Sequence, residues 1–171
     1  MRKATVCASA AVVAVLASAA HAQPFANAKT SQAGYVAGDL RPSAACEQLD
    51  TSRIADAVEI TARTIAAEGN TPQHCRVSGV LSPEVAFEVS LPSTWNGRLY
   101  MIGNGGHAGE ALDNPGRVAQ VRQGLEQGFA VAQTNTGHFA SKEAGASFVL
   151  SNPQKALDYA YRAVHVTAVT A

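Results

Sequence analysis

The sequence has little of three things that would mark a specialised class of protein: aromatic residues, charge and cysteine. Aromatic residues make up 6% and charged residues 15% of its 171 positions, and it has only 3 cysteines. Its 13 lysine and arginine residues are balanced by 13 aspartate and glutamate residues. Without a basic excess, neither nucleic acid nor an anionic membrane surface is expected as a partner. With 47% hydrophobic residues, the composition is typical of a globular domain.

Long apolar runs are absent except at the very start of the chain. There, Arg2 and Lys3 precede an alanine-rich run over residues 8–20, and small residues suited to a cleavage site end at Ala22. This is the pattern of a secretory signal peptide, and the run is too short for a comfortable membrane span. We therefore expect residues 1–22 to be cleaved off and the protein to be secreted or periplasmic, with no membrane attachment afterwards.

The cysteines predict one disulfide bond. Cys7 lies in the signal peptide, which leaves Cys46 and Cys75 as an even pair. In an exported protein such a pair is expected to be oxidised. The bond would close a loop of about 30 residues and stabilise the fold by roughly 3–4 kcal/mol in the chain-entropy model. Two free, buried thiols are the alternative.

Hydrophobic periodicity and turn residues divide the rest of the chain into an irregular lead-in over residues 23–45 and a folded domain over residues 46–171. The segment 57–67 has the spacing of both a helix and a strand, and its β-branched residues favour a strand. The expected elements are a helical turn in 46–54, strands at 57–67, 75–81, 85–91, 99–102 and 129–134, and helices from Pro115 to Gly128 and from Pro153 onward. Asn114 and Asn152 would cap the two helices.

The order of these elements predicts an α/β fold. Strands 75–81 and 85–91 form a hairpin, whereas strand 99–102, its helix and strand 129–134 require a parallel, right-handed crossover. This is the opening half of an α/β-hydrolase sheet. Strand 99–102 is uniformly apolar, so we expect it to be central and covered on both faces. Two surfaces would lie open: the edge of strand 129–134 and the stripe of the last helix formed by Leu157, Ala160, Val164 and Ala168.

The glycine-rich loop Gly103–Gly109, which follows strand 99–102, is the stretch best suited to chemistry. A strand that ends in glycines usually exposes backbone N–H groups beside a negative group. Two chemistries use this arrangement: the binding of a phosphate, and the stabilisation of the oxyanion that forms when an ester is attacked. A flexible loop without a ligand is a third interpretation.

Five motifs, in order and in register, resemble the tannase and feruloyl esterase family of secreted α/β-hydrolases. They are Cys75-Arg76-Val77-x-Gly79, residues 87–92 with 95–97, the loop 103–109, Thr134-x-Thr136-Gly137-His138, and residues 161–165. The resemblance implies hydrolysis of aromatic-acid esters, such as galloyl or feruloyl esters, by a serine nucleophile with an aspartate and a histidine. It also implies a large lid domain, often with a structural calcium ion, and a disulfide joining the neighbours of the catalytic serine and histidine.

By this resemblance the chain is the N-terminal part of such a domain, ending before the nucleophile elbow. The triad and the lid are expected downstream, so we predict no catalytic side chain, metal ligand or cofactor within the chain, which should be inactive and poorly soluble alone. One oxyanion N–H would come from Gly105 or Gly106, with Gly106 favoured. Possible pocket-lining residues are Asn104, His107, Asn135 and His138. The sequence predicts no oligomeric state.

Two positions depart from the family's usual pattern. The family usually has aspartate where this chain has Asn135, and a bulky apolar or aromatic residue where it has His107. Neither Ser147 nor His138 suits a catalytic triad. Ser147 is not in a nucleophile-elbow turn, and His138 precedes any nucleophile, whereas the chain order on this fold is serine, acid, histidine.

Two other functions stay open at this point. The segment Gly103-x-Gly105-x-x-Ala108, with Glu126 about 20 residues further on, nearly fits a dinucleotide fingerprint. However, the loop does not lead directly into a helix, and dinucleotide cofactors are scarce outside the cell. The other alternative is a catalytically inactive exported scaffold or binding protein of the same fold.

Overall fold

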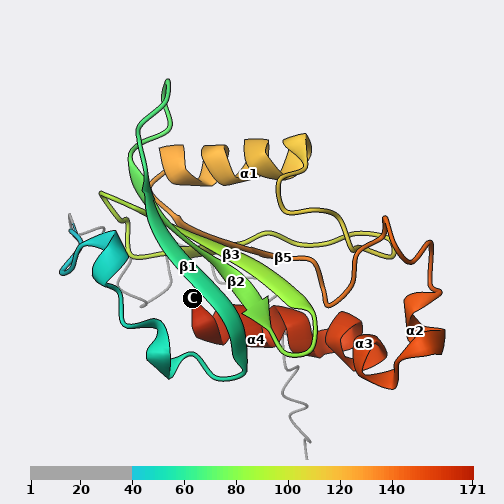
Figure 1. The fold of residues 1–171 in the computed structure, drawn as a ribbon. Coiled ribbons are helices and arrows are strands. Elements are labelled where there is room, and N and C mark those ends of the chain that lie inside the picture. The colour runs from blue at the N-terminus through green and yellow to red at the C-terminus, as the bar shows by residue number, and fades with distance from the viewer. Residues whose placement is uncertain (1–39) are drawn as a thin grey trace, which may run out of the picture. The chain divides into compact units, whose positions relative to one another are not determined.

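A computed structural model describes residues 40–171, which form a five-stranded mixed sheet with helices on both faces (Figure 1). The predicted signal peptide, its cleavage site after Ala22 and residues 23–39 of the lead-in lie outside the described residues. No helix in the described part has the length and hydropathy needed to span a bilayer.

Three antiparallel strands form one side of the sheet: β1 (Ala57–Ile65), β2 (His74–Leu81) and β3 (Val85–Pro92). The β2–β3 hairpin is therefore confirmed, as is the choice of strand over helix for β1. Two short 3-10 helices, η1 (Cys46–Gln48) and η2 (Thr51–Arg53), confirm the helical turn expected before β1.

The other side of the sheet is a strand–helix–strand unit of β4 (Leu99–Met101), α1 (Pro115–Glu126) and β5 (Ala130–Thr134). The two strands pair in parallel, which confirms the predicted parallel connection. The Asn114 side chain caps α1 as expected, because its oxygen accepts a hydrogen bond of 2.9 Å from the Gly116 N–H.

The positions of these two strands in the sheet correct the sequence prediction. The strand order is β1-β2-β3-β5-β4, so β5 is an inner strand and β4 is the edge strand. All residues of β5 are buried, whereas Leu99 and Tyr100 of β4 are 43% and 40% exposed. The crossover through α1 carries the chain back between β3 and β4, so β5 fills the inner position. Apolar composition alone could not distinguish the two positions.

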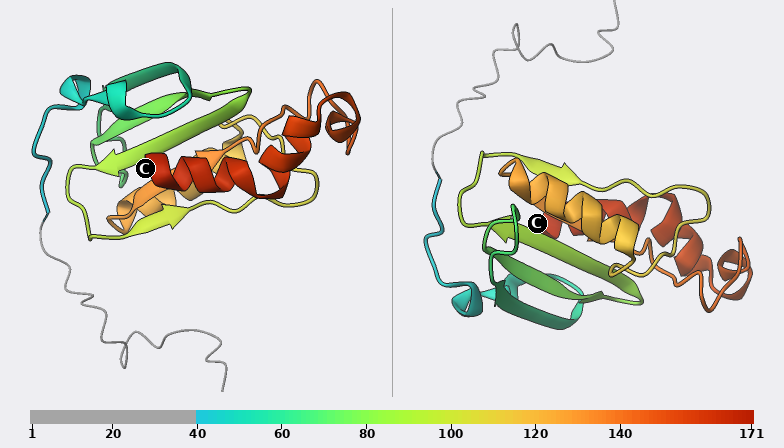
Figure 2. Two further views of the ribbon diagram at one scale, coloured as in Figure 1. Left: turned by 90° about the horizontal axis from the view of Figure 1, so that it is seen from below. Right: turned by 90° about the horizontal axis from the view of Figure 1, so that it is seen from above.

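Alternation along β5 divides the core into two layers. Val131 packs with Val121 and Leu125 of α1, while Ala132 faces the opposite side and packs with Phe87 and Ala163. The helices of the chain's end cover this second face (Figure 2). Both ends of β5 are thereby fixed between two packed layers, which gives the loops at its carboxyl end a rigid base.

The last helical region consists of α2 (Phe148–Ser151), α3 (Pro153–Leu157), a π-helical turn η3 (Asp158–Arg162) and α4 (Ala163–Thr170). Asn152 caps α3 as predicted, accepting from the Gln154 N–H at 2.9 Å. The predicted apolar stripe does lie open: Leu157 is 46% and Val164 is 41% exposed. The opposite face is buried and more polar, with Lys155, Asp158, Ala163 and Thr167.

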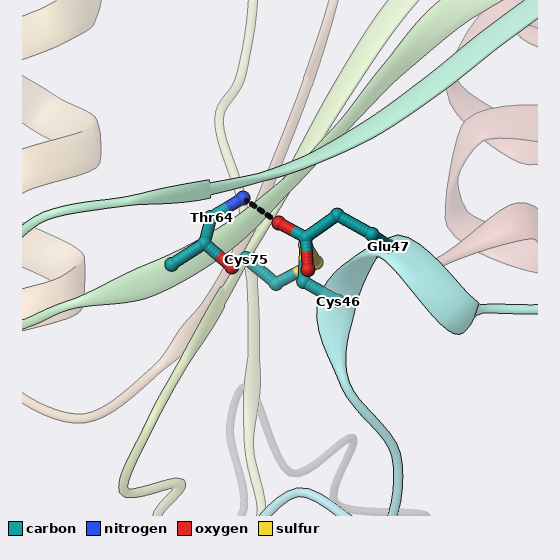
Figure 3. Close-up of a disulfide and its surroundings, with 4 residues drawn as sticks. All are labelled: Cys46, Glu47, Thr64 and Cys75. Atoms are coloured by element: carbon teal, nitrogen blue, oxygen red, sulfur yellow. Dashed lines mark hydrogen bonds between the residues drawn. A yellow bond between two sulfur atoms is a disulfide. The ribbon is translucent and has the colours of Figure 1, made fainter.

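The predicted disulfide between Cys46 and Cys75 is present, with Cα atoms 5.3 Å apart (Figure 3). It joins η1 to β2. The neighbouring Glu47 carboxylate accepts a hydrogen bond of 2.8 Å from the Thr64 N–H, which joins the same helical turn to β1. These two links hold η1 against the antiparallel side of the sheet.

Candidate active site

The glycine loop leaves β4 at the carboxyl edge of the parallel strand pair, where open α/β sheets bind their ligands. The Ile102 N–H still bonds to the Ala132 carbonyl at 2.9 Å, and the chain departs from the sheet at Gly103. Gly105 and Gly106 are exposed, and a Cβ on either would meet no atom within 4 Å. The loop is therefore an open surface of backbone.

The middle of the loop is a tight turn over residues 105–108. The Ala108 N–H donates to the Gly105 carbonyl at 2.9 Å. Gly106 has φ +55°, while His107 is not among the residues with positive φ. This is the pattern of a type II′ turn, whose first central position favours glycine. The requirement for glycine at Gly106 is conformational, since there is space for a side chain.

The N–H groups of this turn are available to a ligand. Within residues 40–171, neither the Gly105 nor the Gly106 N–H donates a hydrogen bond to another protein group, and the same holds for His107. The carbonyls, in contrast, are occupied. The Gly105 oxygen accepts from Ala108, and the Gly106 oxygen accepts a hydrogen bond of 2.7 Å from the Tyr159 hydroxyl.

A second segment, Thr134–His138, supports the glycine loop at the end of β5. The Asn104 side chain donates to the Thr134 carbonyl at 3.0 Å and so joins the two strand ends. Thr136 and Gly137 both have positive φ, at 61° and 87°, which turns the chain sharply beneath the loop.

The Asn135 side chain is fully buried and bonded on both sides. Its oxygen accepts from the N–H groups of Ala86 and Gly137, each at 2.9 Å, so the orientation of the amide is fixed by its neighbours. Its NH₂ group donates to the Glu84 carbonyl at 3.2 Å. Asparagine can donate this last hydrogen bond, but the carboxylate of an aspartate at this position could not.

His138 is fully buried beneath the loop. Its ring stacks on Phe148 with centroids 3.7 Å apart, and a Cβ on Gly109 would lie only 2.6 Å from its Nε2. Burial lowers the pKa of His138 because it disfavours the charged ring, and the nearby carbonyls of Thr136 and His107 oppose this shift in part. Within the described chain neither ring nitrogen makes a hydrogen bond of good geometry, so the ring serves as a flat support.

Charged side chains fix the helical layer to this support. The Lys155 ammonium donates to the carboxylates of Glu143 and Glu84 at 2.7 and 2.8 Å, and these two hydrogen bonds raise the pKa of Lys155. Asp158 is fully buried, bonds to Arg162 at 2.8 Å, and lies so close to Gly137 that a Cβ there would be 2.5 Å away. The glycine loop, the 134–138 segment and η3 are thus three layers in close contact.

The described part of this edge of the sheet holds no candidate metal site. Within residues 40–171, no three His, Cys, Asp or Glu side chains gather closely enough to bind a metal ion. A cavity of about 540 Å³ lies at the other end of the sheet, among residues such as Trp95, Pro92 and Cys46.

Comparison with known proteins identifies the family. A family model described as tannase and feruloyl esterase matches residues 69–171, more than half of the chain. This chain belongs to the tannase and feruloyl esterase family. The predicted resemblance is confirmed.

Curated relatives agree with this assignment. A mono(2-hydroxyethyl) terephthalate hydrolase from Piscinibacter sakaiensis is 30% identical over 122 residues, which cover 58% of this chain and 20% of that protein. A probable feruloyl esterase B-1 from Aspergillus fumigatus is 33% identical over 110 residues, covering 62% of this chain and 19% of that protein. The chain thus spans about a fifth of the length of these relatives.

The crystal structure of an esterase from Aspergillus oryzae has the same fold. It matches with a TM-score of 0.50 and 21% sequence identity, and the match covers 72% of this chain and 27% of that chain. The predicted class, part of an α/β-hydrolase sheet, is confirmed by this likeness.

In this member of the tannase and feruloyl esterase family, the predicted site residues fall into two groups. Gly105, Gly106 and His107 are exposed on the turn, with Asn104 half-buried beside them. Asn135 and His138 are buried underneath. Their pocket-lining role stays a prediction, and in this structure the two buried residues act as supports.

Sequence reasoning missed the contribution of the helical layer, namely Lys155, Asp158 and Tyr159. The available signal was the helix periodicity: polar Lys155 and Asp158 are three residues apart, and both occupy the face that packs on the sheet. A run of buried polar residues at helical spacing opposite an apolar stripe is unusual and could have indicated a supporting network.

Proposed function

We propose that this protein is a carboxylic ester hydrolase that acts on esters of aromatic acids, and that this chain supplies one side of its oxyanion hole. The observation that supports this best is the set of unoccupied N–H groups at Gly105 and Gly106, at the carboxyl edge of a parallel strand pair. Membership of the family, and relatives named as a feruloyl esterase and a terephthalate ester hydrolase, support the same reaction.

In the proposed reaction, a serine hydroxyl from another part of the protein attacks the ester carbonyl carbon while a histidine accepts its proton. The carbonyl oxygen becomes negative, and the Gly106 N–H and the N–H of the residue after the serine donate to it. Collapse of this intermediate releases the alcohol, which takes the proton, and leaves an acyl-serine. Water then repeats the sequence and releases the acid. Losing one such donor typically lowers kcat by about 10²–10³-fold.

The open surfaces of the described chain suggest where the nucleophile strand would lie. The outer edge of β4 has no paired strand among residues 40–171, and Leu99 and Tyr100 are exposed there. A parallel strand added at this edge would end beside the start of the glycine loop, about 5 Å away from β4. A serine at its carboxyl end would then face the loop amides. We propose this placement for the nucleophile.

The experiment is a turnover assay on the complete protein expressed from its gene. Methyl ferulate and methyl gallate would be the substrates, and a fluorophosphonate probe would test for an activated serine. We expect hydrolysis of at least one ester and labelling of a single serine outside this chain. Residues 23–171 alone should show no turnover. Binding of the esters without turnover or labelling would contradict the proposal and favour the inactive scaffold.

A further inference from the structure

The Tyr159 hydroxyl makes a long-range hydrogen bond to a peptide of the turn over residues 105–108. It donates to the Gly106 carbonyl at 2.7 Å, from a residue 53 positions away in the sequence. Tyr159 lies in the π-helical turn η3, and π-helical turns inside α-helices are frequent at functional sites. The bond therefore joins the helical layer directly to the exposed backbone of the candidate site.

The geometry of the peptide bond makes this contact directional. A trans peptide is planar, with its C=O and N–H pointing in opposite directions. The Gly105 carbonyl is held by Ala108, which directs the Gly106 N–H away from the turn. In the same way, the Gly106 carbonyl is held by Tyr159, which directs the His107 N–H away from the helical layer. Two successive N–H groups are thus fixed through their carbonyl partners.

We propose that Tyr159 is a positioning residue that fixes the His107 N–H as a donor to the oxyanion, alongside the N–H of Gly106. This rests on the proposed esterase function. The phenol acts through the Gly106–His107 peptide and does not touch the substrate. Its hydrogen bond also polarises that peptide, which strengthens the His107 N–H as a donor.

Two aromatic contacts and a buried neighbour in the chain hold Tyr159, which is 36% exposed. Its ring lies 5.2 Å from Phe148 and 6.2 Å from His138, centroid to centroid. The preceding residue, Asp158, is buried against Gly137 and paired with Arg162. Because the oxyanion forms only in the transition state, donors held in place before the reaction avoid the cost of reorganisation.

The kinetic test compares Tyr159→Phe with Tyr161→Phe in the complete protein. Phenylalanine keeps the ring contacts and removes only the hydroxyl. Tyr161 is a matched control, because it is 61% exposed and the hydrogen bond to the Gly106 carbonyl comes from Tyr159. We expect Tyr159→Phe to lower kcat about tenfold with KM unchanged, because the donor is loosened and not removed. Inhibition by phenylboronic acid, which forms a tetrahedral adduct, should weaken by a similar factor. Equal kcat in Tyr159→Phe and the control would overturn the proposal.

A structural readout separates this inference from the esterase proposal. Crystal structures of wild type and both variants, in one crystal form, would show the Gly106–His107 peptide directly. We expect one orientation in wild type and in Tyr161→Phe, and a flipped or doubled orientation in Tyr159→Phe. An unchanged, equally ordered peptide in Tyr159→Phe would refute the positioning role. If the wild-type protein hydrolyses no ester, the proposed function fails, but this structural comparison still decides whether Tyr159 orients the peptide.

Discussion

Replacing Asn135 by aspartate should destabilise the protein. The Asn135 oxygen accepts two backbone N–H bonds that a carboxylate would keep. Its NH₂ group, however, donates to the Glu84 carbonyl at 3.2 Å. In the variant a carboxylate oxygen at this fully buried position would face the Glu84 carbonyl oxygen and find no donor there, although that carbonyl keeps its hydrogen bond of 3.0 Å from the Ala86 N–H.

The expected loss is about 1–3 kcal/mol of unfolding free energy at pH 8, the usual cost of an unsatisfied buried polar group. Burial and the facing carbonyl would raise the pKa of the introduced carboxyl in the folded state above its unfolded value. The penalty is therefore largest above the folded pKa and decreases as the pH falls through it, because the protonated carboxyl can donate to the Glu84 carbonyl again.

Urea unfolding followed by circular dichroism, at pH 8 and pH 5, measures both effects. The matched control is Asn114→Asp at the N-cap of α1, where the side-chain oxygen also accepts a backbone N–H at 2.9 Å but lies exposed. This variant should be neutral or slightly stabilising. An Asn135→Asp protein as stable as wild type at pH 8 would refute the role assigned to the amide.

Three further predictions concern stability. Replacing Cys46 and Cys75 by serine should lower the unfolding free energy by about 3–4 kcal/mol, because the unfolded chain without the cross-link has more conformational entropy. Mass spectrometry with and without reductant would test for the disulfide in wild type. Gly109→Ala should lower the unfolding free energy by about 2–3 kcal/mol, because φ is +79° and the new Cβ would lie 2.6 Å from the His138 ring. Urea unfolding measures this loss. A loss below about 0.5 kcal/mol would show that the glycine loop is not in close contact with the 134–138 segment. The lowered pKa of His138 means that the folded state binds fewer protons than the unfolded state below pH 6.5, so stability should fall as the pH decreases from 6.5. His138→Gln should make stability depend less on pH, whereas His165→Asn, at an exposed position, should leave this dependence as it is in wild type. Equal slopes of unfolding free energy against pH in wild type and both variants would contradict the role assigned to His138.

The sequence was most informative where local chemistry decides structure. Asn114 and Pro115 predicted the start of α1, and the pairing of Cys46 with Cys75 followed from their being the two cysteines outside the predicted signal peptide. The hairpin and the parallel crossover could also be predicted, because alternation and connection length restrict the possible topologies.

The remaining features depended on long-range contacts. Strand β4 is as apolar as a central strand, and only the position of β5 makes it an edge. The contact between Tyr159 and Gly106 joins residues far apart in the sequence, and no local pattern predicts it. The glycine-rich loop could be predicted to expose amides, but the carbonyl partners that orient them could not.

Measuring kcat for Gly106→Ala in the complete protein tests the central claim most directly. Gly69→Ala is the matched control. Gly69 has φ +59° and Gly106 has φ +55°, and a new Cβ on either would meet no atom within 4 Å. Gly69 differs in lying between β1 and β2, away from the glycine loop. At position 106, alanine keeps the N–H but is strained at the positive φ, so the turn that directs the N–H should shift. We predict a fall in kcat of about 10–10²-fold on methyl ferulate or methyl gallate for Gly106→Ala, and a change of less than about twofold for Gly69→Ala. Equal turnover by wild type and Gly106→Ala would contradict the account.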